Sequence, residues 1–495
     1  MKTMNTMKMW AALLVAGLAL CACSSDDNEL IPQTEEPQAP QAQTFTMTVS
    51  ASKGGDAATT RGTLTDNGTT VTPEWEVNDE VSVYNASDVL LGTIKAQTAG
   101  ATTTLIGELT TAPAVSDVLT LKYKSANYAT QDGTLAGIAA NCDYATATVT
   151  VSAVDDKKIT TSDASFASQQ AIVKFTLKNS DGSATLDASQ LVVVTNGTTY
   201  TVTPASEAST LYVALPAITN KFITLVATVG GAPYDFVKGG VTFANSNFYR
   251  IGVKMTECRT TTATIPADLG RVIGADGHAY VSPTAATAAG TTVSGIIAYV
   301  GSAGSVDESS TTYKGLAIAL TDANNGNKCA WYTESSGTCV SQTDNPSTAL
   351  GYKNGIACTE TLVNSDGTGV TTNCSGHIHA AAITANSYPT ARPSGVSAWF
   401  LPSMGQWQLI VQGLATKHYG HTYNTALTTS SNASYKAAGL NNVITSVGGT
   451  GFQSYYYWAS TGYQSGKAYN MGFEFGSLGA LRMTEDAYVR AVFAF

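Results

Sequence analysis

The sequence predicts a mainly β protein built of many short strands, with helical patterns confined to its C-terminal part. Gly, Thr, Ser, Ala and Val dominate the composition, and long helical patterns are scarce, which favours short strands. Several segments alternate apolar and polar residues with period two, as a half-buried strand does. Turn dipeptides separate these segments: Asn67-Gly68, Asp132-Gly133, Asp181-Gly182 and Asn196-Gly197. A length of 495 residues suggests about three domains.

The first 22 residues are typical of a signal peptide. Lysines precede an uncharged stretch from Trp10 to Ala19, which is shorter than the ~20 residues that span a bilayer as a helix. Cys23 closes the run LCAC that follows, and bulky Leu20 makes Cys21 a poorer first residue of the mature chain. The pattern resembles a bacterial lipoprotein signal peptide, which implies lipidation of Cys23. An ordinary secretory signal with incidental cysteines is the alternative.

Residues 23–43 predict a tether, because acids, glutamines and three prolines leave little that could enter a core. Its start at 24–29, SSDDNE, resembles the acidic export signal of Bacteroidota surface lipoproteins, which implies the cell surface and the outer membrane. A solvated acidic linker is the alternative. The net charge of −10 and the lack of a basic patch argue against nucleic acid as a partner.

The first sandwich is expected over residues 44–160. Phe45, Met47 and Val49 alternate with polar residues, so they share the inward face of the leading strand. A loose stretch of small residues carries Arg61, and another strand-like segment follows Trp75.

These segments resemble the fimbrillin family, the lipoprotein-derived pilins of the Bacteroidota. The motifs "TTRGTLTDNG" and "EWEVNDEVSVYN" resemble its first domain. The motifs "FASQQAIVKFTLKNSDGS" at 166–183 and "SNFYRIGVKM" at 246–255 resemble the opening and closing strands of its second domain, expected over 161–257. The resemblance covers roughly residues 44–256 and implies two transthyretin-like β-sandwiches in tandem.

In fimbrillins, an extracellular trypsin-like protease cuts after an arginine in the loop behind the first strand. The resemblance therefore implies cleavage after Arg61 and departure of the strand that carries Phe45, Met47 and Val49. A strand from another pilin subunit would fill the groove by β-strand addition. In the alternative, Arg61 is an ordinary exposed loop residue and the chain stays closed and anchored.

Residues 258–495 have a different pattern. Ser403 and Gln406 form a capping box, and apolar residues recur at i, i+3, i+4 and i+7 from Trp407, which predicts a helix over 404–416. A weaker helical pattern starts near Ser375, and the end of the chain is rich in strand-like segments. The ordered motifs "WFLPSMGQWQLI", "YYYWAST" and "YVRAVFAF" resemble a lectin-like domain whose fold is like that of C-type lectins.

Cysteines and aromatic residues in this domain suggest further features. For an exported chain we expect local disulfides, Cys329–Cys339 and Cys358–Cys374, although four cysteines permit three connectivities and free buried thiols are the alternative. Tyr455 and Tyr457 would share one face of a strand, opposite Tyr456 and Trp458. With Tyr463 they are candidates for an exposed platform that binds a sugar or a protein, and simple packing is the alternative.

No cofactor, metal site or catalytic site is expected. His377, His379, His418 and His421 lack a CxxC or HExxH context, so solvated or capping roles are favoured over zinc. Carboxylates are sparse near the aromatic strand, and "WAS" stands where a calcium-dependent sugar triplet would lie in the lectin family. No activated nucleophile, paired carboxylates or phosphate loop stands out, so an enzyme is not expected.

The sequence thus predicts a cell-surface fimbrial subunit, with the trailing domain displayed as an adhesin at the end of a fibre. About 240 residues follow the fimbrillin-like part, so a free C-terminal donor strand is not expected. A pilus anchor, or a solitary surface lipoprotein that binds glycans or proteins, is the alternative. A surface enzyme acting on glycans is a third hypothesis.

Overall fold

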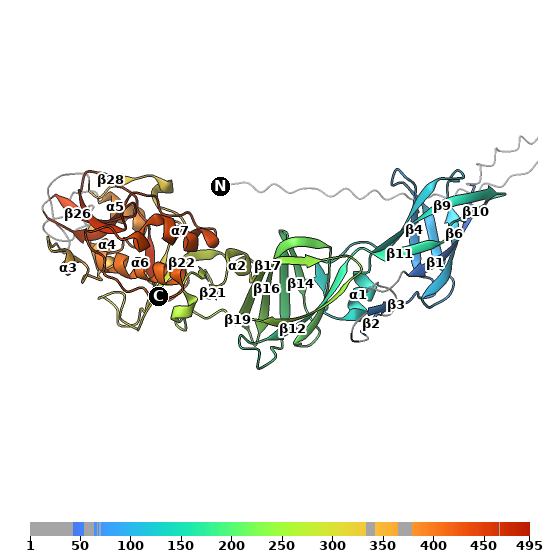
Figure 1. Ribbon diagram of the computed structural model, residues 1–495, viewed down its shortest axis with the longest axis horizontal. Helices are drawn as coiled ribbons and strands as arrows, with labels where there is room; N and C mark the ends of the chain where they lie inside the picture. Colours follow the sequence, from blue (N-terminus) through green and yellow to red (C-terminus); the bar gives the residue numbers. More distant parts are fainter. Residues whose placement is uncertain are drawn as a thin grey trace, which may run out of the picture. The chain divides into compact units, whose positions relative to one another are not determined.

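The structure is a computed structural model, shown in Figure 1, and it describes residues 43–53, 64–66, 68, 71–332, 342–364, 379–464 and 466–495. Strands make up most of its regular structure, which confirms the mainly β class. Cys23, Arg61, Cys339, Cys374 and His377 lie outside the described residues. Among those described, no helix has the length and apolar character needed to cross a bilayer.

The first sheet closes on itself through its leading strand (Figure 1). Pairing runs in the order β1, β6, β5, β4, β7 and β9, and returns to β1 through β10 and β11. The boundary expected between residues 160 and 161 falls inside β10. The bounds are β1 Phe45–Lys53, β4 Glu80–Tyr84, β5 Leu90–Ala96, β6 Thr102–Leu109, β7 Val118–Tyr123, β9 Ala145–Asp155, β10 Lys158–Thr161 and β11 Ala164–Ser168.

The core of this sheet forms where alternating apolar side chains point inward from every strand. Trp75 is its largest member, and it packs edge-on against Tyr123 and Phe166 at ring distances of 5.5 and 5.3 Å. Such edge-to-face pairs add to the effect of burial. Between this sheet and the next sandwich lies a short hairpin, β2 (Leu64–Asp66) and β3 (Val71–Pro73).

The second sandwich packs a sheet in the order β15, β12, β18 against one in the order β19, β17, β16, β13, β14, β8. Asn196 and Gly197 have φ of 49° and 77° between β13 and β14, as a tight hairpin turn requires, so this predicted turn is confirmed. The bounds are β8 Thr130–Gln131, β12 Ala171–Lys178, β13 Gln190–Thr195, β14 Thr198–Val202, β15 Thr210–Leu215, β16 Ile218–Val229, β17 Ala232–Phe243, β18 Phe248–Lys254 and β19 Thr256–Glu257.

One segment between strands of the first sheet belongs to the second core. β8 pairs in parallel with β14, and helix α1 (Leu135–Asn141) buries Ile138 among the side chains of the second sandwich. Thr134 begins α1 by accepting a hydrogen bond from the Gly137 amide. The chain therefore enters the second sandwich through β8 and α1 and returns to the first sheet at β9, so the two sandwiches do not follow one another cleanly along the sequence.

The C-terminal domain combines sheets β21-β20-β22-β23-β29, β25-β26-β27 and β24-β28 with helices, of which α6 lies against β22 and α7 (Figure 1). Its strands are β20 Val272–Gly274, β21 Ala279–Tyr280, β22 Val293–Val300, β23 Gly315–Ile318, β24 Cys329–Ala330, β25 Tyr456–Gly462, β26 Lys467–Gly472, β27 Ser477–Arg482, β28 Asp486–Ala487 and β29 Val492–Ala494. Its helices are α2 Pro283–Ala288, α3 Pro346–Ala349, α4 Gly355–Asn364, α5 Ala380–Asn386, α6 Met404–Tyr419 and α7 Ala437–Ser446, with 3-10 turns η1 Pro266–Asp268, η2 Asn324–Gly326 and η3 Ala433–Tyr435.

The helix predicted over 404–416 is confirmed as α6. Both hydrogen bonds of the capping box are present, between Ser403 and Gln406. The helix runs to Tyr419, three residues beyond the expected end, because Gly420 with φ of 74° is the residue that ends it. The weaker helix expected from Ser375 is α5, which begins at Ala380; residues 365–378 lie outside the described part of the chain.

We expect Ser403→Ala to lower the free energy of unfolding of the C-terminal domain by about 1–2 kcal/mol. The change removes the cap of α6, and it also removes the hydroxyl that donates to the Tyr352 carbonyl at 2.7 Å. Guanidinium unfolding followed by tryptophan fluorescence measures this. Ser454→Ala, at an exposed serine outside any helix, is the matched control and should change nothing. Equal stability of the two variants would contradict the assigned cap.

Candidate functional sites

Strand β1 is hydrogen-bonded along both edges. On one side it runs antiparallel to β6, from Phe45 opposite Leu109 to Ser52 opposite Thr102. On the other side it runs parallel, first to β10 and then to β11. A strand in this position has no free backbone edge, and its removal would leave unpaired edges on both sides.

The inward face of β1 carries the apolar residues that the period-two pattern indicated. Met47, Val49 and Ala51 are buried, whereas Thr46, Thr48 and Ser50 are exposed. Phe45 is half-buried at the start of the strand and packs against the same core. At the other end the Lys53 ammonium lies 4.2 Å from the centre of the Trp75 ring, a cation–π contact.

Asp66 connects the β2–β3 hairpin to the second sandwich. Its Oδ2 accepts hydrogen bonds from Lys174 at 2.7 Å and Tyr212 at 2.8 Å, and its Oδ1 accepts one from Arg250 at 2.6 Å. The three donors stand side by side across β15, β12 and β18, because Lys174 pairs in register with both others. A single carboxylate thereby fixes the hairpin to the outer face of this sheet.

The environment of Asp66 strongly favours its charged form. Burial alone would raise the pKa of this carboxyl, but the hydrogen bonds from Lys174, the Gly68 amide, Tyr212 and Arg250 together lower it well below its ordinary value. The stabilisation is therefore present above the unfolded-state pKa of about 4 and is lost as the pH falls below it.

Asp66→Asn should weaken the attachment of the hairpin by about 2 kcal/mol at pH 7, because hydrogen bonds to a charged acceptor are lost. Exchange of the backbone amide hydrogens of residues 71 and 72 should then be faster by tenfold or more. The difference from the wild-type chain should shrink as the pH is lowered from 5 to 3, because the carboxyl of the detached hairpin, with its ordinary pKa, takes up a proton while the attached one stays charged. Asp88→Asn, at an exposed ion pair with Lys122 in the first sheet, is the control. A pH-independent difference would contradict the role of the carboxylate.

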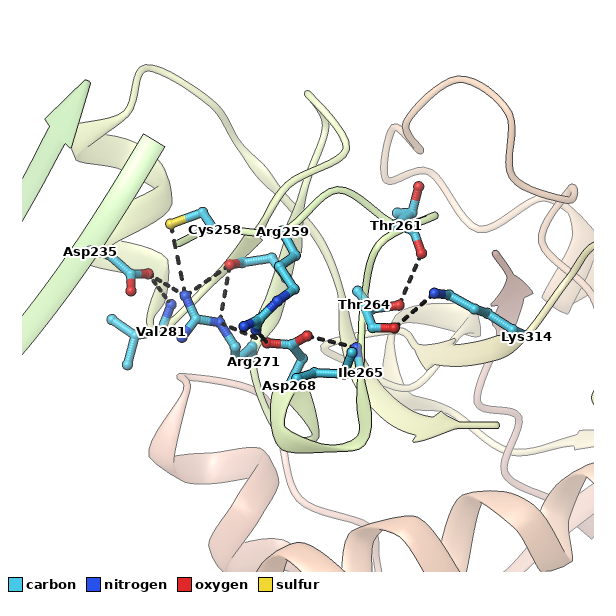
Figure 2. Close-up of polar contacts among 11 residues, drawn as sticks. Asp235, Cys258, Arg259, Thr261, Thr264, Ile265, Asp268, Arg271, Val281 and Lys314 are labelled. Atoms are coloured by element: carbon cyan, nitrogen blue, oxygen red, sulfur yellow. Dashed lines mark hydrogen bonds and ion pairs between the residues drawn. The ribbon is translucent and has the colours of Figure 1, made fainter. Parts of the chain in front are cut away.

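Figure 2 shows a second ionic cluster, where the second sandwich meets the C-terminal domain. Asp235 on β17 accepts hydrogen bonds at 2.6 Å from the Arg271 guanidinium and from the Val281 amide. Arg271 also donates to the Ala279 carbonyl, and its Nε lies 4.0 Å from Asp268. Burial opposes the charge of Arg271, but the Asp235 carboxylate outweighs that effect and the pKa of Arg271 is raised.

Apolar packing accompanies this cluster. Val192 and Val226 of the second sandwich share a core with Tyr280, Ala285 and α6 of the C-terminal domain. Cys258 is buried beside Arg271, and burial raises the pKa of its thiol, so the thiol stays protonated and unreactive. Charge pairing and apolar contact together join the two bodies.

Arg271→Met should destabilise the protein by about 3–5 kcal/mol, because it leaves the Asp235 carboxylate buried without a counter-charge. Chemical unfolding followed by tryptophan fluorescence measures the loss. The double variant Asp235→Asn with Arg271→Met removes both charges and should recover a large part of it. If the double variant were as unstable as the single one, uncompensated charge would not be the cause.

The expectation of a tyrosine platform is wrong for Tyr457. This side chain is completely buried. Its hydroxyl donates a hydrogen bond to Asp322 at 2.8 Å and accepts one from the backbone N–H of Gln453. β25 is covered on both faces, so the residues of this strand do not alternate between core and solvent. Tyr455 is 38% exposed, and Tyr463 is half-buried against the edge of Tyr469, so these two remain candidates on the surface.

Among the residues that the structure describes, the remaining candidates form no metal-binding cluster. No disulfide joins two of the described cysteines, and the predicted partners Cys339 and Cys374 lie outside the described residues. Burial raises the pKa of Cys329 to about 11. His379 is buried and stacks on Tyr332 at 4.8 Å. Within the described ranges, no three His, Cys, Asp or Glu side chains gather as ligands for one ion.

No protein-family model matches the sequence, and no curated protein matches it. The structure is similar to a fimbrial protein from Bacteroides ovatus, with 13% identity, a TM-score of 0.29, and coverage of 91% of this chain and 99% of the other. It is also similar to a fimbrial assembly protein from Parabacteroides distasonis, with 14% identity, a TM-score of 0.27, and coverage of 43% and 92%.

Proposed function

We propose that this protein is a fimbrial subunit of the bacterial cell surface, assembled by proteolysis-triggered strand exchange, with its C-terminal domain displayed as an adhesin. The observation that carries the proposal is the position of β1. This strand precedes Arg61, is hydrogen-bonded along both edges, and fills the first core with Met47, Val49 and Ala51.

The physical consequence of losing β1 is a vacancy that few ligands can fill. β6 on one side and β10 with β11 on the other would each keep one neighbouring strand but lose β1 as the backbone partner of the opposite edge. Burial of Met47 and Val49 contributes about 1.5–3 kcal/mol for each side chain. A replacement must restore the hydrogen bonds and the alternation together, which a β-strand from another subunit does.

Cleavage by itself would not release the strand. Both edges of β1 and its buried face would still hold the severed segment in place, so the cut chain stays closed until a competing strand arrives. The severed β1 and an incoming strand with the same alternation then compete for the same place in the sheet, and their concentrations and affinities decide which one is bound. This order keeps an open apolar groove from persisting in solution.

The second sandwich supports a place at the end of a fibre. After β18 the chain does not hang free: β19 pairs with β17, with Glu257 opposite Tyr234. The Asp235–Arg271 cluster then ties the following domain to the same strand. A shaft subunit must both accept and donate a strand, whereas among the described residues the end of this sandwich is engaged. The C-terminal domain is left as the part that meets a ligand.

An arginine-specific protease should cut the native precursor after Arg61 and release, on denaturation, an N-terminal fragment ending there. Arg61 is the first arginine of the sequence, and Arg250, Arg271 and Arg490 are held by ion pairs in the folded protein. Mass spectrometry identifies the fragment. Arg61→Lys keeps the charge and should resist the protease. Absence of the Arg61 fragment from the native precursor would refute assembly by this route.

The same cut protein tests whether exchange follows the geometry of β1. A labelled peptide of residues 44–53 should displace the severed segment on native gel filtration. The peptide with Met47→Asp and Val49→Asp should not, because it would bury two unpaired carboxylates. Displacement by both peptides alike would contradict insertion into the first core.

A pilus anchor, or a solitary surface lipoprotein, is the second candidate, and the double pairing of β1 favours it because an uncut strand is held firmly. Such a protein keeps its lipid on Cys23 and its leading strand. Mass spectrometry of protein recovered from cells separates the two: an acylated Cys23 indicates the anchor, and a chain that starts at Gly62 indicates the assembled subunit.

A further inference from the structure

An open cavity of about 780 Å³ lies in the C-terminal domain. None of its lining residues belongs to β1 or to the strands that pair with β1. Three separate segments line it: residues 321–326, the end of α5 with residues 384–390, and residues 450–453. Its volume is in the range of sites that bind small molecules or part of a larger ligand.

One buried arginine holds these walls together. The Arg490 guanidinium is completely buried and donates to Asp322 Oδ1 at 2.7 Å, to the Ala319 carbonyl at 3.0 Å and to the Thr450 carbonyl at 2.9 Å. It also lies over the Phe452 ring, 4.9 Å from its centre. Two lining segments far apart in the sequence are thereby fixed to a common point, which makes the cavity a built feature rather than a gap between loops.

The lining carries no free charge. Asp322 is the carboxylate among the lining residues, and both of its oxygens are occupied, Oδ1 by Arg490 and Oδ2 by the Tyr457 hydroxyl. The other polar groups are hydroxyls and amides of Thr, Asn, Ser, Gln and Tyr. An ionic ligand would find no counter-charge here, whereas a neutral ligand covered with hydroxyl groups would meet donors and acceptors on several sides.

Two of the amide side chains are available to a ligand. Asn325 and Gln453 are exposed, and their side-chain amides form no hydrogen bond with the described residues. Asn324, Asn325 and Gly326 have φ of 55°, 53° and 78°, three left-handed residues in succession. Such backbone is sparsely populated and is often found at ligand-binding sites.

An aromatic residue completes the lining. The Tyr388 ring is half-buried and packs edge-on against Trp399 at 4.9 Å, and its hydroxyl is 2.7 Å from Thr321 Oγ1. It is therefore held rigidly and combines apolar surface with a polar group. Tyr455 is near the same region, because its ring contacts the Lys328 ammonium at 4.4 Å and its amide donates to the Gln453 carbonyl.

We propose that this cavity binds a neutral oligosaccharide and is the ligand site of the C-terminal domain. The inference rests on the proposed function as an adhesin and names the ligand class that this function leaves open. Hydroxyl-rich rings match the neutral donors and acceptors, and their apolar faces match Tyr388. The site is built around Asn325, Gln453 and Tyr388, in place of the platform that included Tyr457.

The test is a printed array of neutral, sialylated and sulfated glycans, probed with the whole mature chain, followed by titration of the strongest neutral glycan. We expect binding to neutral glycans. Asn325→Gly with Gln453→Ala should weaken it at least tenfold without changing the melting temperature, because glycine accepts the φ of 53° and Gln453 is exposed. Asn196→Gly, another exposed asparagine with positive φ but in the second sandwich, is the matched control and should bind as the wild-type chain does.

Three results would overturn the assignment: no neutral glycan bound, binding confined to charged glycans, or equal binding by the cavity variant and the wild-type chain. None of them depends on assembly, because the array uses the uncut chain. If the chain is cleaved and exchanges its peptide normally but binds no neutral glycan, only the glycan proposal is rejected and the assembly proposal stands. If the chain binds neutral glycans but the protease leaves it intact, the assembly proposal is rejected and the glycan-binding proposal stands.

Discussion

The first sheet owes its closure to β1, which pairs with strands on both sides. With β1 in place, every strand around this core has hydrogen-bonding partners, and no long apolar edge is left for another chain. The same strand supplies Met47, Val49 and Ala51 to the core, so its backbone and its side chains serve one purpose. A closed sheet of this kind presents no long unpaired edge to another chain, and removal of the closing strand would expose two.

Charged residues make up only 13% of the chain. Several of them form ion pairs that connect segments far apart in the sequence. Asp66 joins the hairpin to the second sandwich, Asp235 with Arg271 joins that sandwich to the C-terminal domain, and Asp322 with Arg490 joins the walls of the cavity. Desolvating a charge is costly, so a buried pair adds little net stability but penalises any arrangement that separates its members. These pairs therefore specify which segments meet, while apolar packing supplies most of the stability.

Local features could be predicted from the sequence, and contacts between distant segments could not. The alternation of β1, the capping box of α6 and the Asn196-Gly197 turn depend on neighbours within a few residues. The partners of Asp66 lie 108, 146 and 184 residues away, and no local pattern marks them. The prediction that Tyr457 is exposed was wrong for a different reason. A period-two pattern assigns residues to the two faces of a strand, but it cannot show that both faces of β25 are covered. The cavity likewise gathers three segments that carry no motif.

The described residues on either side of Arg61 are attached to different domains. β1, which precedes Arg61, belongs to the first sheet, whereas Asp66, which follows it, is held by the second sandwich. A cut between them therefore severs β1 from the chain without loosening the hairpin, whose ionic contacts do not involve β1. The free energy that an incoming strand must match is then that of β1 alone. Under the proposed exchange, a strand with the same alternation and length would match it, and the rest of the chain would keep its structure.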